Sequence, residues 1–193
     1  MKKTIVLVVA LLVLGACGGD EVDLANPAYG DVAVSGQALP QFSDPTADPA
    51  IGMPAPSVSG VDFNGQAVEF TPGHGPAVLV FLAHWCPHCQ SELPVLAAWQ
   101  EANPDMLGLE MYAVATGTAN TQPNYPPGPW IEREGWAGSV IMDDQNYTAA
   151  KQFGLASYPY FVVVDSDGLV QLRTSGELPA PQVDALLQAA SEL

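Results

Sequence analysis

Basic side chains are scarce in this sequence. Lys and Arg together number 5 against 21 Asp and Glu in 193 residues, and the formal net charge is −16. Nucleic-acid binding depends on Lys and Arg side chains that neutralise phosphates, and attraction to anionic lipid headgroups depends on the same charges. Five basic residues cannot form such a patch. We therefore expect no nucleic-acid binding and no electrostatic attraction to anionic lipid.

Cysteine is scarce as well, and only three are present. An exported domain held together by structural disulfides would carry more cysteines, spread along the chain. Long apolar runs are also missing. A membrane-spanning helix needs ~20 apolar residues, whereas the run over residues 4–14 has eleven. That length is typical of the apolar core of a signal peptide.

The start of the chain has the pattern of an export signal. Lys2 and Lys3 precede the apolar run, and Leu14-Gly15-Ala16-Cys17 follows it. These four residues resemble the bacterial lipobox, whose cysteine is lipidated and becomes the new N-terminus. The resemblance implies a signal peptide over 1–16 and a lipid on Cys17. The protein would then lie outside the cytoplasm, anchored to a membrane by that lipid. Loss of the signal peptide with Lys2 and Lys3 would leave a mature charge of about −18. An ordinary cleaved signal followed by a chance cysteine is the alternative.

Residues 17–50 have the composition of a tether rather than of a folded unit. They hold six acidic residues, no basic ones and four prolines, without a sustained hydrophobic period. A segment of this kind buries too little apolar surface to fold alone. We therefore expect an acidic, proline-containing linker over 17–50 and one globular domain over 51–193.

The domain alternates between strand and helix patterns. The run over 77–83 is continuously apolar, as in a central strand buried on both faces. Apolar residues at helical spacing follow over 89–97, and Asn103-Pro104 ends that helix. The pattern predicts an α/β fold with a central mixed sheet flanked by helices, an N-terminal hairpin and a central insertion. Other strands are expected near 68–70 and over 109–115, 139–142, 160–164 and 169–174, with helices over 145–153 and 183–190.

The chemistry is expected at the sequence Trp-Cys-Pro-His-Cys over 85–89. Cys86 and Cys89 lie three residues apart, directly after the central strand and at the start of a helix. A disulfide across so short a loop stabilises little by chain entropy, whereas the N–H groups and dipole of a helix start favour the nucleophilic thiolate. We therefore expect Cys86 to attack or be attacked, and Cys89 to resolve the mixed disulfide. An inert disulfide and half of a zinc site are the alternatives, although structural zinc usually takes four ligands and no second CxxC is present.

Three segments of the domain resemble the thioredoxin superfamily: Ile51–Pro56, Phe81–Pro94 and Ser157–Asp165. Within it they are most similar to the TlpA/ResA-like group of membrane-tethered thiol-disulfide oxidoreductases. The resemblance covers 51–193 and implies a thioredoxin-like fold that exchanges electrons with protein thiols and disulfides. It also implies a membrane redox partner that resets the cysteine pair, and no cofactor other than that pair. Residues within 117–136 resemble an insertion found in some members.

The resemblance also assigns roles to two residues near the cysteines. Glu92, three residues after Cys89, is the proton relay for that cysteine, and Val80 stands where thioredoxin has a buried Asp. Pro159 is a cis-proline that faces the CxxC and keeps backbone polar groups available to a substrate peptide. An exposed helix acid and an ordinary strand-start proline are the alternatives.

Further residues are expected beside the nucleophile. Trp85, Pro87 and Tyr158 are candidates for substrate binding, and Tyr158 either narrows the groove or tunes the redox potential. His88 is expected to stabilise the thiolate as a charge or as a hydrogen-bond donor, with a solvated helix-start residue as the alternative. His84 is expected at the surface near the site.

The sequence leaves the direction of exchange open. The scaffold favours a reductant, whereas the Pro87-His88 dipeptide is the choice of DsbA-type oxidants. A copper-binding module that uses Cys86, Cys89 and a His is the main alternative from another class, since thiolates select Cu(I). A peroxide-reducing enzyme of the same superfamily is a third, although its usual cysteine pattern is absent. No resident metal is expected, and the protein is expected to be a monomer.

Overall fold

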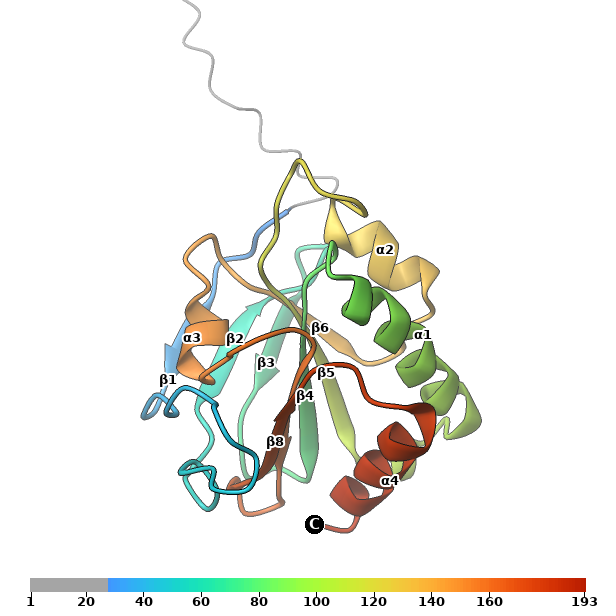
Figure 1. The fold of residues 1–193 in the computed structure, drawn as a ribbon. Coiled ribbons are helices and arrows are strands. Elements are labelled where there is room, and N and C mark those ends of the chain that lie inside the picture. The colour runs from blue at the N-terminus through green and yellow to red at the C-terminus, as the bar shows by residue number, and fades with distance from the viewer. Residues whose placement is uncertain (1–27) are drawn as a thin grey trace, which may run out of the picture.

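The computed structural model describes residues 28–193, which form two β-sheets with helices around them (Figure 1). An antiparallel sheet consists of β1 (Ala33–Ser35), β2 (Ser57–Val61) and β3 (Ala67–Phe70), in that order. A mixed sheet has the order β6 (Ser139–Met142), β5 (Glu110–Ala115), β4 (Ala77–Leu82), β7 (Tyr160–Val164) and β8 (Val170–Ser175). In this sheet β4 pairs parallel with β5 and antiparallel with β7.

The central strand β4 contributes to two hydrophobic cores. All six of its residues are buried. Successive side chains of a strand point to opposite faces, so Val78, Val80 and Leu82 join one core, and Ala77, Leu79 and Phe81 join the other. The continuous apolar run in the sequence therefore reflects burial on both faces, as predicted.

Helices cover one face of the mixed sheet, and the smaller sheet covers the other (Figure 1). α1 (Pro87–Ala102) and α4 (Ala180–Ser191) pack on the first face, together with α2 (Pro127–Arg133) from the insertion. A short 3-10 turn, η1 (Met106–Gly108), follows α1. The antiparallel sheet and α3 (Thr148–Gln152) pack on the second face. The predicted fold class is therefore confirmed.

The expected tether is wrong over residues 28–50. Residues 28–50 belong to the folded unit, because β1 pairs with β2 and thereby adds a third strand to the predicted hairpin. Leu39, Phe42 and Ala50 are buried in the second core, and the Phe42 N–H donates to the carbonyl of Gly154 at 2.8 Å. These apolar residues are too widely spaced to form a local period. They bury their surface only against segments from elsewhere in the chain.

A buried ion pair joins this segment to β8. The Arg173 guanidinium donates from Nε to Oδ2 of Asp48 at 2.8 Å and from Nη2 to Oδ1, and both side chains are essentially inaccessible. Its Nη1 donates to the carbonyls of Pro40 at 2.8 Å and Phe153 at 3.2 Å. Burial acts to raise the pKa of Asp48, but hydrogen bonds from Arg173 and from the Ala50 N–H more than offset it, so this pKa lies below its ordinary value.

The helix α3 is shorter than the predicted helix over 145–153. The Asp143 carboxylate accepts the N–H groups of Ala149 and Ala150 at 2.9 and 3.1 Å, and Asp144 accepts the N–H of Thr148 at 2.9 Å. Carboxylates that accept these otherwise unpaired N–H groups stabilise a helix start. The helix therefore begins at Thr148.

The predicted signal peptide over 1–16 and the predicted lipid on Cys17 lie outside the described residues. Both stay predictions. No helix within residues 28–193 combines the length and the apolar character needed to cross a membrane.

Candidate active site

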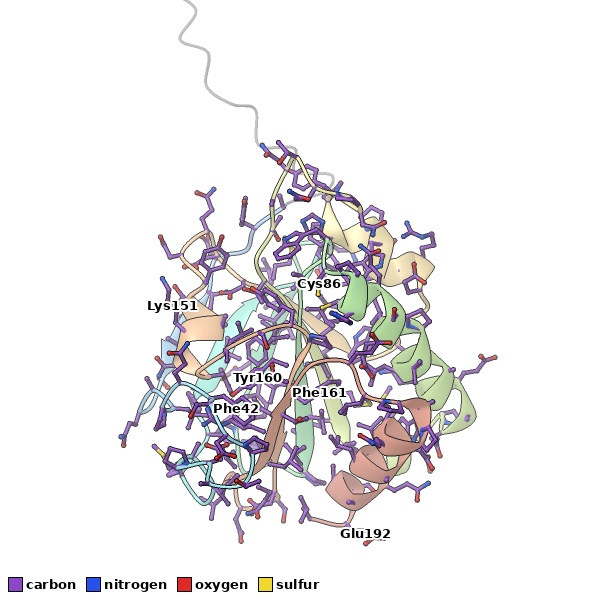
Figure 2. All side chains as sticks on the ribbon, in the orientation of Figure 1. Phe42, Cys86, Lys151, Tyr160, Phe161 and Glu192 are labelled. Atoms are coloured by element: carbon purple, nitrogen blue, oxygen red, sulfur yellow. The ribbon has the colours of Figure 1, made fainter. Side chains whose placement is uncertain are left out.

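The cysteine pair lies where β4 leads into α1, and Figure 2 labels Cys86 at the start of that helix. The N–H of Cys86 donates to the Ala83 carbonyl at 3.0 Å, and its own carbonyl accepts the N–H of Gln90 at 3.0 Å. Cys86 is 7% exposed, whereas Cys89 is completely buried. Both thiols are free. Cys86 is therefore the cysteine that another molecule can reach, whereas Cys89 is covered.

Glu92 is a buried acid on the same face of α1 as Cys89, since residues three apart on a helix are neighbours. Its Oε2 accepts the N–H of Leu178 at 2.6 Å, while Oε1 has no hydrogen-bond partner among the residues that the structure describes. Burial raises the pKa of Glu92 to about 7, the Leu178 N–H opposes this, and the charge of Glu177 adds to it. Burial also raises the pKa of the Cys89 thiol, and the charges of Cys86 and Glu92 raise it further.

Trp85, Tyr158 and Pro159 surround the accessible sulfur. The Cys86 thiol lies 3.9 Å from the carbonyl oxygen of Tyr158, and the Tyr158–Pro159 peptide bond is cis, as predicted. The Trp85 and Tyr158 rings pack edge to face with centres 5.9 Å apart. The Trp85 indole N–H donates to the Gly117 carbonyl at 2.7 Å. An extended client segment would therefore meet backbone acceptors and aromatic rings next to the sulfur.

His88 bonds to a partner that the sequence did not suggest. Its Nδ1 lies 2.8 Å from Oε2 of Glu177, and its side chain is 66% exposed. Among the described residues, Glu177 is the only hydrogen-bond partner of this ring. Because the two residues are 89 positions apart, no local pattern could have paired them. Pro87 is the first residue of α1, where its missing N–H costs no helical hydrogen bond.

His84 is buried, so the expected surface position is wrong. Its Nδ1 lies 2.6 Å from the Pro123 carbonyl oxygen, and its Nε2 accepts the N–H of Ala119 at 3.1 Å. Nδ1 therefore carries the proton and Nε2 the lone pair, which makes the ring neutral. The Asn124 side-chain amide donates to the His84 carbonyl at 3.1 Å. The position of His84 directly after the apolar run over 77–83 was the available signal of burial.

The insertion should loosen when the solution is acidified. Burial lowers the pKa of His84 from its ordinary 6.5, although the Pro123 carbonyl opposes this. When the insertion opens, the His84 ring meets solvent and binds a proton below about pH 6.5, which the ring buried under the insertion does not. The packed arrangement of the insertion therefore loses stability relative to the open one as pH falls. We expect the hydrogen-exchange protection factor of the Ala119 amide to fall about tenfold between pH 7.5 and pH 5. A change of that size is near the upper end of the net free energy that one hydrogen bond contributes.

Two matched variants test the origin of this effect. His84→Leu should give weak protection of the Ala119 amide at both pH values. His74 is exposed in a turn, so His74→Leu should retain the pH dependence. Equal protection of Ala119 at pH 7.5 and pH 5 in the unmodified chain would disprove the expected loosening.

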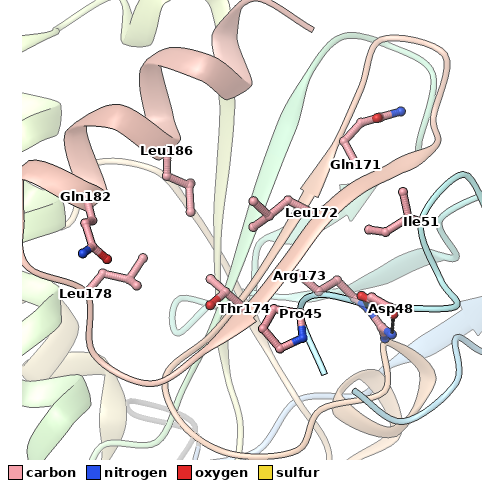
Figure 3. A pocket seen from close by; sticks show the side chains of 10 residues that line it. All are labelled: Pro45, Asp48, Ile51, Gln171, Leu172, Arg173, Thr174, Leu178, Gln182 and Leu186. Carbon is pink, nitrogen blue, oxygen red and sulfur yellow. Dashed lines mark hydrogen bonds and ion pairs between the residues drawn. The ribbon is translucent and has the colours of Figure 1, made fainter. Parts of the chain in front are cut away.

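One cavity of the structure lies away from the reactive groups. That cavity, of about 380 Å³, lies between β8 and α4 and is walled in part by Leu172 and Leu186 (Figure 3). None of the predicted site residues lines it. Within residues 28–193, no group of three or more His, Cys, Asp or Glu side chains is placed to hold a metal ion.

Solved structures with a similar fold include thiol-disulfide proteins. A thiol:disulfide interchange protein of the thioredoxin family from Chlorobium tepidum has a TM-score of 0.60 and 24% identity, over 75% of this chain and 99% of that one. A secreted Mycobacterium tuberculosis disulfide oxidoreductase homologous to Escherichia coli DsbE has a TM-score of 0.57 and 19% identity, over 68% of this chain and 94% of that one. A hypothetical protein from Sinorhizobium meliloti has a TM-score of 0.64 and 16% identity, over 76% of this chain and 86% of that one. At these identities the likeness shows a shared fold.

The fold and the paired cysteines define a class, the thioredoxin-fold proteins with a dithiol site at the start of a helix. The sequence model of the AhpC/TSA family matches residues 51–173, which is more than half of the chain. The chain belongs to the AhpC/TSA family. The predicted place in the thioredoxin superfamily is thereby confirmed, while the finer resemblance to the TlpA/ResA-like group stays a prediction.

Proposed function

We propose that this protein is a thiol-disulfide oxidoreductase that exchanges electrons with protein thiols and disulfides. The observation that carries the proposal is the pair of free thiols at the start of α1, with Cys86 partly accessible and Cys89 buried behind it. The cysteines carry the electrons themselves, so no further cofactor is needed. A membrane redox protein resets the pair after each turnover.

The exchange proceeds through one mixed disulfide. The Cys86 thiolate attacks a client disulfide, a Cys86–client S–S bond forms, and the second client sulfur leaves as a thiolate that takes a proton from solvent. Cys89 then loses its proton and attacks Cys86 Sγ, which closes the Cys86–Cys89 disulfide and releases the first client sulfur. The client gains the two electrons that the pair loses, and the reverse sequence oxidises a client dithiol.

Glu92 is the proposed acceptor of the Cys89 proton. Burial holds the Cys89 thiol protonated and raises the pKa of Glu92 to about 7, so the carboxylate form becomes available as pH rises through neutrality. We expect decay of the mixed disulfide to accelerate with pH around 7 in single-turnover experiments. Glu92→Gln should slow this decay by about 10²-fold, the low end for general-base catalysis, and remove the pH dependence.

A matched substitution on the same helix controls for the loss of charge. Glu101 is exposed on α1, so Glu101→Gln should leave both the rate and its pH profile unchanged. If Glu92→Gln keeps the full rate and the same pH profile, the relay role is wrong.

The direction of exchange is decided by the reduction potential of the Cys86–Cys89 disulfide, measured on the full chain in glutathione buffers. A value near ~−120 to −180 mV would identify an oxidant of client thiols, and a value near ~−270 mV or below would identify a reductant. A chain that forms no reversible disulfide would contradict the proposed function.

We further propose that the protein works outside the cytoplasm as a lipoprotein. The support is the pattern of basic residues, apolar run and lipobox over 2–17. Metabolic labelling with a fatty acid should mark the wild-type chain and leave Cys17→Ala unmarked. A wild-type chain without label would contradict the anchor.

A further inference from the structure

A groove of about 270 Å³ opens beside the cysteine pair. One wall is formed by the packed rings of Trp85 and Tyr158. The rest of its apolar lining comes from α3 and its flanks, with Tyr147, Ala150 and Leu155. Gly117 also lines the groove, and a Cβ built there would lie 2.6 Å from the Tyr158 hydroxyl. The lack of a side chain at this glycine therefore lets the Tyr158 ring take its place in the wall.

The groove and the reacting sulfur share one neighbour, Tyr158. The carbonyl of Tyr158 lies 3.9 Å from Cys86 Sγ, while the ring of the same residue forms part of the wall. A client joined to Cys86 by a mixed disulfide must place the residues that flank its own cysteine within a few ångströms of these atoms. The groove is therefore a surface that a flanking client residue can reach during the exchange.

A lysine side chain, that of Lys151, lines this groove. Among residues 28–193 the basic side chains are Arg133, Lys151 and Arg173. Arg133 pairs with Glu134 at 3.2 Å, and Arg173 is buried against Asp48. Lys151 forms no salt bridge within that range.

Lys151 belongs to α3 and lies apart from Cys86, which is at the start of α1 (Figure 2). Its ammonium lies 5.9 Å from the centre of the Tyr147 ring. A chain with a formal charge of −16 thus presents beside its aromatic groove a positive charge that forms no salt bridge among residues 28–193.

We propose that this groove selects acidic client segments: an apolar side chain next to the client cysteine fills it, and a neighbouring carboxylate pairs with Lys151. The proposal rests on the proposed function, since the groove matters only while Cys86 holds a client. Charge complementarity is the physical basis. Acidic groups elsewhere on this protein repel a client carboxylate, so the ion pair with Lys151 favours one register of the bound segment.

Model peptides can measure the preference on the full chain, solubilised in a non-ionic detergent. Each peptide carries one cysteine in a mixed disulfide with thionitrobenzoate, a flanking Leu, and Glu, Gln or Lys at each neighbouring position in turn. The Cys86 thiolate attacks the peptide sulfur, a Cys86–peptide disulfide forms, and coloured thionitrobenzoate leaves. The measured quantity is the second-order rate constant for thionitrobenzoate release from each peptide in a single turnover of the reduced chain.

We expect a Glu peptide to react about threefold faster than its Lys counterpart at one position, which is the size that one partly exposed ion pair supports. Added salt should shrink the difference. Lys151→Gln should abolish the preference, and Lys151→Glu should reverse it. Arg133→Gln removes the same charge from a residue that does not line the groove, so it should retain the wild-type preference.

The outcomes separate the inference from the proposed function. Equal rates for Glu, Gln and Lys peptides in the wild-type chain would overturn the inference and leave the proposed function standing. An unchanged preference in Lys151→Glu would overturn the role of Lys151. If no peptide reacts with a chain that is folded by circular dichroism, the proposed function itself fails.

Discussion

Replacing Cys86 with serine should reduce thiol-disulfide exchange to the uncatalysed background. Cys86 is the partly accessible member of the pair, and Cys89 is completely buried, so no second sulfur of the site can take over the attack. Cys89→Ser should behave differently. It retains the nucleophile but lacks the resolving thiol, so a mixed disulfide between Cys86 and the client should accumulate. Insulin turnover and intact-protein mass spectrometry distinguish the two results.

The third cysteine provides the matched control for this pair. Cys17→Ser replaces the cysteine that precedes the described residues, and the detergent-solubilised variant should exchange at the wild-type rate. Full activity in Cys86→Ser would contradict the mechanism. Accumulation of mixed disulfide in Cys86→Ser rather than in Cys89→Ser would reverse the roles of the two cysteines.

Asp48→Ala should destabilise the fold by about 3–5 kcal/mol, because it leaves the Arg173 guanidinium buried without its counter-charge. Both side chains of this pair are essentially inaccessible. A loss of this size is a large part of the ~5–15 kcal/mol that stabilises a typical domain. Urea denaturation at pH 7 measures it. The pKa of Asp48 is lowered from 3.8, so the stabilisation is present above about pH 4 and is lost as pH falls further.

An exposed acid on the same segment controls for the change of net charge. The Asp44 carboxylate accepts the Thr46 N–H at 2.8 Å in an exposed turn, so Asp44→Ala should cost much less stability than Asp48→Ala. Equal losses in the two variants would mean that the buried ion pair contributes no special stability. Rescue by Arg173→Met in the Asp48→Ala background would support the account, because that change removes the unpaired charge.

The core of the fold could be predicted from local patterns. The apolar run at 77–83 predicted a strand buried on both faces, and all six residues of β4 are buried. Helical spacing after Cys89 predicted α1, and the resemblance around Pro159 predicted the cis peptide bond that the structure contains. Each of these features leaves a signal in neighbouring residues, because side-chain alternation, helical period and helix starts are set within a few positions.

Features that depend on distant partners were missed or misread. Residues 28–50 have an acidic, proline-containing composition, yet their apolar side chains and Asp48 are buried against β7, β8 and the end of α3. The burial of His84 depends on the backbone of the insertion 35 to 39 residues away. Composition reports how much apolar surface a segment holds, but not which distant surface can cover it.

The sequence by itself determined which chemistry this protein carries: two thiols one helical turn apart at the end of a buried strand, in a chain with almost no positive charge. Only the tertiary structure decided the surroundings of those thiols. It pairs His88 with Glu177, buries Glu92 behind Cys89, and sets Lys151 at the rim of the groove beside Trp85. The physical reason is that a long-range hydrogen bond, a desolvated acid and a groove each need groups brought together from separate segments, whereas a helix start with its cysteines is made within one.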